Sequence, residues 1–503
     1  MLHTRHPRPL NPLVDRNPFR QQALPEENVS IPSLAEIKTL LPEPVLPEHE
    51  GWTALYWRAW EILWASLRPP TPGSGFVAPY VSASDSDYLL MWDAAMLTQP
   101  GLYGRRAFNF MSTLDNLYAH QQDDGFICRA AHQQTGQDGY FPFDPNSTGP
   151  NILACAEWRY FRLSGDDGRM PHVFWPLLAL HQWYRDNRTW PGGGYWATGL
   201  SSQMDNQPRV PNSRDHHRHW TWVDATMQAA LNCNCLAQMA AHLGETDLAA
   251  TLKDEHVQLV EWINRRLWNE EAQFYQDVSP DGRFSSIKSI GAYWALFDSS
   301  MVPEKRLNAF VQALRENWAF NLPHRIPSIS ADSEAYNAES GNRWRGGVWP
   351  DMNFMVLRGL RNVGQHVLAH AIACNHVQHV YQVYQNTGYF WDNYAPEAVM
   401  PGEPARKNAL TACITPIALL LEDVIGLSTD WPHRRVYWDR RLDTGQVYGV
   451  RRYPLGADGL LDVVGDRHQV TLTSNTPFTL VIRDAAQNLQ TAVSAGTTTI
   501  DLT

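Results

Sequence analysis

Apolar residues recur at the three- and four-residue spacing of amphipathic helices from Thr53 to about position 426. The stretch 53–67 is apolar on nearly every face, with Arg58 and Glu61 as its only charges, which predicts a buried helix. The stretch 246–268 has one broad apolar stripe, typical of a helix with its other face in water. The pattern predicts helices at 53–67, 88–98, 105–121, 150–164, 171–187, 219–243, 246–268, 286–298, 303–317, 347–363, 365–384 and 406–426.

These helical segments are joined by alternately short and long loops. Such an alternation favours six helix pairs closed into a ring, so the expected fold class is an all-α (α/α)6 toroid barrel. An α-solenoid would require an internal sequence repeat, and the sequence shows none.

The two ends of the chain have a different texture. Residues 1–50 are rich in proline and charge, which predicts an extended N-terminal arm. Residues 430–503 hold short β-branched runs separated by Gly, Asn and Asp, which predict a small C-terminal all-β domain. The helical domain therefore spans 51–429.

Composition narrows the class of partner. A formal net charge of −11 argues against binding to nucleic acid, which needs a basic surface. No apolar run approaches the roughly 20 residues that cross a bilayer, so no membrane partner is expected. The N-terminus lacks the apolar core of a signal peptide. The six cysteines lie mostly in helical patterns and are expected to be reduced thiols of a cytoplasmic protein.

The loop 199–210, GLSSQMDNQPRV, holds a single carboxylate, Asp205, among small and amide residues, followed by Arg209. An Asp-Asn-x-Pro sequence is ordinary turn chemistry, so Asp205 could simply shape a turn. A carboxylate in a loop at the mouth of a helical scaffold could instead serve as a general acid.

Other loops gather Trp, Asp, Arg and Gly. Asp93, after Trp92, is either a helix cap or an acceptor for sugar hydroxyls. Asp124 lies in a DDG turn that could also face a ligand. Arg345 stands between Trp344 and a glycine pair beginning at Gly346, which favours rigid binding of a carboxylate or sugar and close backbone approach. The alternative is a structural Arg345 paired with Asp351.

The buried-looking Glu157 requires a partner or a shifted pKa, because its neighbours in 150–164 are apolar. The loop 387–409 offers Asp392, Glu397 and Glu403 before the last predicted helix. A second carboxylate on a separate loop is what glycoside hydrolysis needs beside Asp205: one protonates the leaving oxygen and the other activates water.

Together these stretches resemble glycoside hydrolase family 63 and its trehalase-like relatives. The resemblance lies in MWDAA at 91–95, in TGLSSQMDNQPR at 198–209 with WVD at 222–224, in WRGGVWPDMN at 344–353 and in WDNYAP at 391–396, in the family's order. It covers about 88–426 and implies an (α/α)6 barrel that cleaves α-glycosides with inversion.

The resemblance also implies roles for individual residues. The family's general acid falls on Asp205 and its general base on Asp392, where the family more usually has Glu. Because Asp is one methylene shorter, Glu397 is the alternative base. The substrate-binding candidates are Trp92, Asp93, Asp124, Arg209, Trp344, Arg345, Gly346, Trp349 and Tyr394. The expected partner is a carbohydrate, a small α-glucoside or related oligosaccharide.

No cofactor or metal is expected. The cluster RDHHRHW contains His216, His217 and His219, which lack the i, i+4 spacing of two ligands on one helical face. A solvated or substrate-rim loop is the preferred interpretation. Two alternatives to a hydrolase remain: a degenerate carbohydrate-binding protein on the same fold, or a sugar epimerase or phosphorylase, although the sequence has no glycine-rich phosphate loop.

Overall fold

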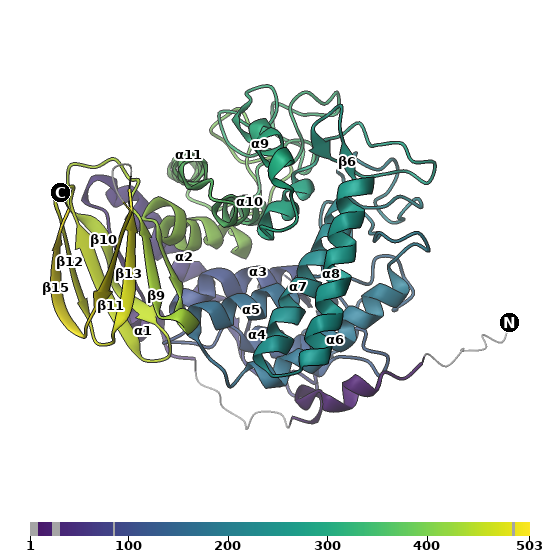
Figure 1. The fold of residues 1–503 in the computed structure, drawn as a ribbon, viewed down its shortest axis with the longest axis horizontal. Coiled ribbons are helices and arrows are strands. Elements are labelled where there is room, and N and C mark those ends of the chain that lie inside the picture. The colour runs from purple at the N-terminus through teal and green to yellow at the C-terminus, as the bar shows by residue number, and fades with distance from the viewer. Residues whose placement is uncertain (1–8, 23–30, 84–85, 485–487, 503) are drawn as a thin grey trace.

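Helices are the main regular structure between positions 50 and 424 in the computed structural model, which describes residues 9–22, 31–83, 86–484 and 488–502. The α-helices in this region are α2 (Glu50–Ala65), α3 (Met91–Gly101), α4 (Ser112–Ala119), α5 (Leu153–Ser164), α6 (Met170–Asn187), α7 (Val223–His242), α8 (Thr246–Arg266), α9 (Glu304–Gln312), α10 (Pro350–Asn362) and α11 (His366–Thr387). Figure 1 shows them gathered into one helical body. The long helices lie close to where the apolar periodicity predicts them.

Two predicted helices take other forms. The segment predicted at 286–298 is a 3-10 helix, Ile290–Phe297, packed against α10. The segment predicted at 406–426 is mainly a π-helix, Thr415–Val424, in which the Ile425 amide donates to the Leu420 carbonyl, five residues earlier. Both segments are buried, so the apolar pattern marks buried helical segments but does not distinguish the width of the helical turn.

Long loops lead into the N-termini of α3, α5, α7 and α10. The strand β4 (Tyr88–Leu90) precedes α3 and pairs with β5 (Ala130–His132), which precedes α5. Residues 188–222 precede α7, and residues 316–349 precede α10, whose first residue is Pro350. The motif-bearing loops therefore all reach helices at the ends where backbone N–H groups are unpaired.

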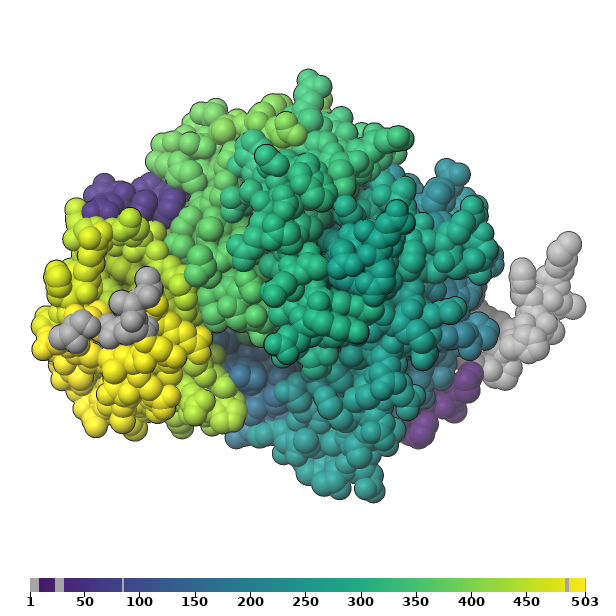
Figure 2. Space-filling view, turned by 45° about the horizontal axis from the view of Figure 1, so that its top comes forward, coloured from purple at the N-terminus to yellow at the C-terminus, as the bar shows by residue number. Residues whose placement is uncertain are grey.

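The C-terminal part forms two sheets at one end of the molecule, yellow in Figures 1 and 2. One sheet has the order β1-β10-β11-β12-β15 and the other β14-β13-β9-β8. Their strands are β1 (Glu43–Val45), β8 (Leu427–Asp430), β9 (Arg435–Asp439), β10 (Tyr448–Leu455), β11 (Gly459–Gly465), β12 (Gln469–Ser474), β13 (Phe478–Arg483), β14 (Asn488–Val493) and β15 (Gly496–Asp501). The β-rich texture predicted from 430 onward is confirmed.

The predicted N-terminal arm is more ordered than its composition indicates, although positions 1–8 and 23–30 lie outside the described residues. Short 3-10 helices occupy Pro12–Arg16 and Pro18–Gln21, and α1 occupies Leu34–Ile37. Strand β1 pairs antiparallel with β10 through Glu43 to Val45, so the arm supplies an edge strand to the C-terminal sheet. Prolines set the turns here, and burial of Phe19 and Ile37 fixes the arm to the body.

The buried Glu157 on α5 has the partner that its surroundings require. Arg169 donates from Nε and Nη2 to the two carboxylate oxygens, both at 2.7 Å, and the Tyr118 hydroxyl donates to Oε1 at 2.9 Å. Arg169 also donates to Asp115 at 2.8 Å. Burial raises the pKa of Glu157, whereas Arg169 acts to lower it. This ion pair links α4, α5 and the start of α6.

Replacing Arg169 with Met is expected to reduce the free energy of unfolding by about 3 kcal/mol, because it leaves a buried carboxylate without its cation. Urea unfolding followed by circular dichroism measures the change. The double variant R169M/E157Q should recover part of the loss, and R283M, at an exposed pair with Asp281, should change nothing measurable. Equal stability of R169M and wild type would contradict this role.

Two further expectations concern the whole chain. All six cysteines are free thiols, five of them buried. Among the described residues, no helix is both long enough and apolar enough to cross a membrane.

Candidate active site

The side chain of Asn206 joins the Asp205 loop to residues 342–347, the WRGG loop. Asn206 donates from Nδ2 to the carbonyl of Asn342 at 2.9 Å and accepts at Oδ1 from the Trp344 amide at 3.0 Å. Gln207 donates to the carbonyl of Ser328 at 2.9 Å, and Ser328 lies next to the WRGG loop. The residues that follow Asp205 therefore fix its position relative to 342–347.

The WRGG loop is fastened in turn to the 391–397 loop. Val348 and Tyr394 exchange both backbone hydrogen bonds, each at 2.9 Å. Close packing requires glycine here, because a Cβ on Gly347 would lie 2.3 Å from the Arg343 carbonyl, and one on Gly402 would lie 1.7 Å from Asn393 Oδ1. Three motif loops that are distant in sequence are thus brought together at one face of the helical body.

A cavity of about 340 Å³ opens beside Asp205. Its walls come from β4, from β5 and the following turn, from the Asp205 loop and from Arg343, so each wall precedes a different helix. This volume suits a small sugar ligand. The lining residues are Tyr88, Leu90, Arg129, Ala130, Gly139, Tyr140, Leu200, Gln203, Asp205 and Arg343.

Asp205 is the single carboxylate among the described residues of this lining. Its side chain is 22% exposed, and Oδ1 lies 3.4 Å from Nε of Arg343 without meeting hydrogen-bond geometry. Among the described residues, Oδ1 has no hydrogen-bond partner. Asp205 therefore lines the cavity, while its Oδ1 is enclosed beside Arg343.

Asp392 lies in the adjoining loop but is enclosed, at 1% exposure. Its Oδ1 accepts from Asn393 Nδ2 at 2.8 Å and from the Arg406 amide at 2.9 Å. Its Oδ2 accepts from Arg406 Nε at 2.9 Å. The Arg406 side chain is 59% exposed, so it covers the carboxylate from the solvent side.

Glu397 is the exposed carboxylate of the same loop. It accepts a hydrogen bond from the Tyr336 hydroxyl at 2.9 Å, and that ring packs against the backbone of Gly346. A Cβ on Gly346, whose φ is +136°, would lie 2.8 Å from the ring. Gly346 is thus needed for packing of the loop, and its amide donates to Ser328 Oγ at 3.0 Å.

The three candidate tryptophans are buried and do not belong to the cavity lining. Trp344 and Trp349 stack with their centroids 3.9 Å apart and are 2% and 6% exposed. Trp92 donates from Nε1 to Asp351 Oδ2 at 2.8 Å, which joins the N-termini of α3 and α10. Asp93, next to Trp92, is half-buried. In this structure these side chains stiffen the loops that form the cavity.

Of the other substrate-binding candidates, Arg209 is fully buried. It donates to Asp224 at 2.7 Å, lies 3.6 Å from Asp277 and stacks 4.4 Å above the Trp222 ring. Tyr394 is also fully buried, and its hydroxyl accepts from the Trp391 amide at 3.2 Å. These two residues hold the loops from within.

The remaining two candidates lie elsewhere. Asp124 accepts from Trp183 Nε1 at 3.1 Å and from the Phe126 amide at 3.1 Å, beside the N-terminal arm and away from the Asp205 cavity. Arg345 is half-buried, and its carbonyl accepts from the Asn337 amide at 2.7 Å. The alternative considered from the sequence, an ion pair of Arg345 with Asp351, is not formed. Asp351 instead accepts a hydrogen bond from Trp92.

The structure also brings forward residues that sequence reasoning missed. Arg343, with a φ of +58°, turns toward Asp205, whereas its neighbour Arg345 does not line the cavity. Arg129 donates to the Leu200 carbonyl at 2.6 Å and to the Tyr140 hydroxyl at 2.8 Å. The sequence signal for the direction of Arg343 was the GNR turn, because asparagine readily adopts left-handed backbone.

Asp351 titrates in an unusual range. Burial raises its pKa from 3.8 to about 6, although hydrogen bonds from Trp92 and the Met352 amide favour the charged form. The folded state therefore binds a proton more tightly than the unfolded chain. The stabilising contribution is complete below about pH 4 and is lost as the pH rises through 6.

The variant D351N is expected to lose less stability than wild type between pH 4.5 and pH 8. The difference should reach at most about 3 kcal/mol, because each pKa unit corresponds to about 1.4 kcal/mol. Asn keeps an acceptor for Trp92, so the comparison isolates the buried charge. Urea unfolding at the two pH values measures it, and parallel pH profiles for both proteins would contradict it.

A larger groove, of about 650 Å³, lies where α5 meets the β-rich part. Its Asp166 is already engaged, because it accepts from the Tyr160 hydroxyl at 2.7 Å and the Gly168 amide at 2.9 Å. Trp431 there is 5% exposed and offers little ring face to a sugar. No motif loop reaches this groove, so the cavity beside Asp205 is the better candidate site.

The histidine cluster packs as an aromatic group. His216 and His217 have ring centroids 4.2 Å apart, and His217 lies 4.5 Å from Trp196. Burial and the neighbouring cations lower the pKa of His217 to about 4. The three histidines do not form one of the metal-sized groups found among the described residues.

Comparison with known proteins decides the family. A sequence model of the mannosylglycerate hydrolase MGH1-like glycoside hydrolase domain matches residues 91–405. The chain belongs to this family. The match covers the α3 start, the Asp205 loop, the WRGG loop and the 391–397 loop. It confirms the resemblance to glycoside hydrolase family 63 and identifies the protein as a glycoside hydrolase.

Individual relatives of the chain are distant in sequence. A protein of Borreliella burgdorferi is 23% identical over 385 residues, covering 74% of this chain and 79% of that protein. A probable mannosyl-oligosaccharide glucosidase of Schizosaccharomyces pombe is 25% identical over 257 residues, 44% of this chain and 31% of that protein. The mannosylglycerate hydrolase of Thermus thermophilus is 30% identical over 131 residues, 24% of this chain and 30% of that protein.

Solved structures support the fold. The crystal structure of the GH63 mannosylglycerate hydrolase from Thermus thermophilus in complex with glucose matches with a TM-score of 0.58 at 20% identity, covering 72% of this chain and 99% of that chain. The structure of an alpha-L-rhamnosidase from Dictyoglumus thermophilum matches with a TM-score of 0.61 at 10% identity, over 91% of this chain and 50% of that chain. The second match extends the similarity beyond the helical body.

Proposed function

We propose that the protein is an inverting α-glycoside hydrolase whose helices close into an (α/α)6 barrel, with Asp205 as the general acid. The observation that carries the proposal is the position of Asp205, the single carboxylate among the described residues that line a cavity of about 340 Å³ beside the converging motif loops. The partner is a carbohydrate of small size, because the cavity would hold little more than two sugar rings.

The reaction needs two carboxyl groups on opposite faces of the sugar. Asp205 donates its proton to the glycosidic oxygen as the bond to the anomeric carbon breaks. A base on the 391–397 loop takes a proton from a water molecule, whose oxygen bonds to the anomeric carbon from the other face. One water is consumed, and the free sugar and alcohol leave with inverted configuration at the anomeric carbon.

Asp392 is the proposed base, because its motif position matches the base of the family. The hydrogen bonds from Arg406 and Asn393 are those that an ionised carboxylate accepts best. They also cover it, so Arg406 has to move aside before a water can reach Oδ2. Since the Arg406 side chain is 59% exposed, this movement costs little packing. Glu397, already exposed, is the alternative base.

The charge of the cavity favours a second, narrower candidate function. Two arginines, Arg129 and Arg343, line it against the single carboxylate of Asp205. Arg343 is only loosely held, at 3.4 Å from Asp205, and its guanidinium lies 5.8 Å from the Trp349 ring centroid. A guanidinium with unused donors binds carboxylates well. This favours an α-glycoside of a small hydroxy acid, such as a glucosyl- or mannosyl-glycerate.

A substrate screen tests both statements. The purified protein is incubated with α-linked disaccharides, with glucosyl- and mannosyl-glycerate, and with the matching glycerol glycosides, and released monosaccharide is measured. Hydrolysis of any α-glycoside supports the proposed function, and hydrolysis of none contradicts it. A preference for glycerates over glycerol glycosides that is lost in R343Q supports the anionic aglycone, whereas no preference in wild type contradicts it.

A further inference from the structure

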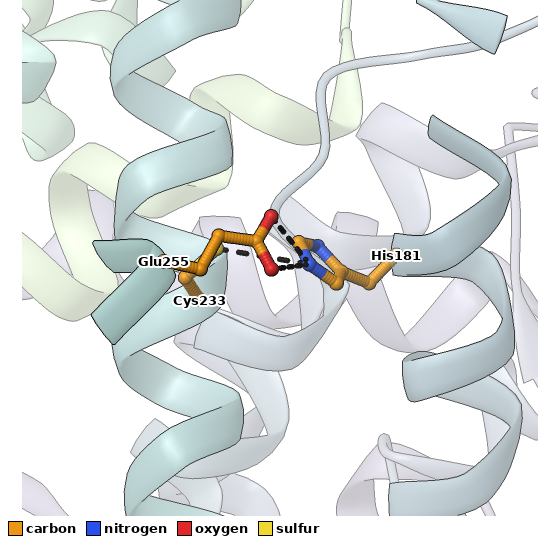
Figure 3. A group of neighbouring side chains, drawn as sticks. All are labelled: His181, Cys233 and Glu255. Carbon is orange, nitrogen blue, oxygen red and sulfur yellow. Dashed lines mark hydrogen bonds and ion pairs between the residues drawn. The ribbon is translucent and has the colours of Figure 1, made fainter. Parts of the chain in front are cut away.

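Three side chains from successive helices meet away from the Asp205 cavity. His181 lies on α6, Cys233 on α7 and Glu255 on α8, and their possible ligand atoms all lie within 4.8 Å of one another (Figure 3). His181 and Cys233 are 1% and 0% exposed, and the Glu255 side chain is 19% exposed. The carboxylate therefore lies at the outer edge of a buried pair.

The spacing fits the edges of a tetrahedral zinc site. With bonds of about 2.0–2.1 Å to nitrogen or oxygen and about 2.3 Å to sulfur, tetrahedral angles place nitrogen roughly 3.5 Å from sulfur and roughly 3.4 Å from oxygen. Here His181 Nε2 lies 3.7 Å from Cys233 Sγ and 3.2 Å from Glu255 Oε1. These two edges are within a few tenths of an ångström of the tetrahedral values, and the edge between Cys233 and Glu255 is at most 4.8 Å.

The surroundings fix the histidine ring. Asn232 Nδ2 lies 3.3 Å from His181 Nδ1. A 180° turn of this side-chain amide exchanges its nitrogen and oxygen; Asn232 would then accept the Nδ1 proton and leave the Nε2 lone pair directed at Cys233 and Glu255. A second hydrogen bond of this kind is what orients a metal-binding histidine.

From this geometry we infer that His181, Cys233 and Glu255 form a binding site for Zn²⁺ that holds α6, α7 and α8 together. Nitrogen, sulfur and carboxylate donors in one tetrahedron suit Zn²⁺ better than Ca²⁺ or Mg²⁺, which prefer oxygen alone. A water molecule can occupy the fourth position at the partly exposed Glu255 edge. Binding replaces the thiol proton of Cys233 by the metal, so one proton is released.

The charged groups beside the three side chains permit a bound cation. Arg185 Nη1 lies 3.7 Å from Glu255 Oε2 and opposes a cation, but its side chain is 48% exposed and can turn toward Asp186, 3.6 Å away. Burial raises the pKa of the Cys233 thiol well above its ordinary value. A divalent ion beside the thiol would reverse this effect. The zinc site is independent of the proposed glycosidase activity.

A second cysteine–histidine pair provides a matched control. Cys374 Sγ lies 3.4 Å from His370 Nε2, four residues earlier on α11. The His181 group is the single three-residue group of metal-binding type among the described residues, so the α11 pair lacks the third donor. The variant C374S thus removes a half-buried cysteine next to histidine without touching the proposed site.

The test titrates chelator-treated full-length protein with Co²⁺ and then with Zn²⁺. The expected result is one Co²⁺ per chain, with a thiolate-to-cobalt charge-transfer band and the visible absorption of a tetrahedral site, both displaced by one equivalent of Zn²⁺. Zn²⁺ should also raise Tm. C233S should lose the band and the Tm shift, N232A should bind about tenfold more weakly, and C374S should behave as wild type.

Two results would overturn the inference. The first is no stoichiometric Co²⁺ or Zn²⁺ binding by wild type. The second is a charge-transfer band that survives in C233S, or that disappears in C374S instead. Because a C233S protein that fails to fold would be uninformative, X-ray absorption of the zinc-loaded wild type provides the second readout. One sulfur with nitrogen and oxygen ligands supports the site, and a shell of oxygen and nitrogen alone contradicts it.

Discussion

Replacing Asp205 with Asn is expected to lower kcat for the best α-glycoside of the screen by about 10³-fold, because the leaving oxygen loses its proton donor. Folding should be unaffected, since the side chain is partly exposed and its ion pair with Arg343 is long, at 3.4 Å. Initial rates of monosaccharide release and the Tm of both proteins measure the two parts of this prediction.

A substrate with a better leaving group separates acid catalysis from other roles of Asp205. Fluoride leaves without protonation, so D205N should hydrolyse the corresponding α-glycosyl fluoride at a rate within about tenfold of wild type. D215N is the matched control, since Asp215 is 59% exposed and pairs with Arg214 outside the cavity. Unchanged activity of D205N on the ordinary glycoside would remove Asp205 from the mechanism.

The base variant should differ from D205N on the glycosyl fluoride. D392N is expected to lose about 10³-fold in kcat on the glycoside and on the glycosyl fluoride alike, because both reactions need an activated water. E397Q should retain activity within about tenfold if Asp392 is the base. The reversed pattern, an active D392N and an inactive E397Q, would transfer the role to Glu397.

Folding must be monitored in this pair of variants. Asp392 also accepts hydrogen bonds from the Arg406 amide and from Asn393, so D392N removes part of the support of the loop. Glu397 has a Tyr336 contact at the surface, and E397Q should leave Tm almost unchanged. A rate recovered by azide in D392N, with formation of a glycosyl azide, would show that the variant retains its site and lacks only the base.

The helical body could be predicted from the sequence because apolar spacing is a local pattern. Apolar spacing alone placed α2, α6, α7 and α8 to within a few residues. The contribution of residues 43–45 to the C-terminal sheet was not accessible in the same way, since β1 pairs with β10, which lies at the far end of the chain. A three-residue strand carries too little pattern to indicate such a partner.

The candidate site could be predicted only in part, because its contacts join residues that are distant in sequence. The motif around Asp205 identified a residue that lines a cavity, but burial of Asp392 depends on Arg406, fourteen positions further on, which no spacing rule indicates. Trp344 and Trp349 attract attention as sugar platforms, yet they stack on each other. Arg343 was missed because its direction is set by a left-handed turn, for which the only sequence signal is the preceding Asn342.

The anomeric configuration of the first sugar released tests the central claim most directly. Proton NMR spectra recorded in the first minutes of α-glycoside hydrolysis distinguish the two anomers before they interconvert. Attack by water on the face opposite the departing oxygen predicts the β-anomer first. Initial release of the α-anomer would contradict an inverting reaction between Asp205 and the 391–397 loop.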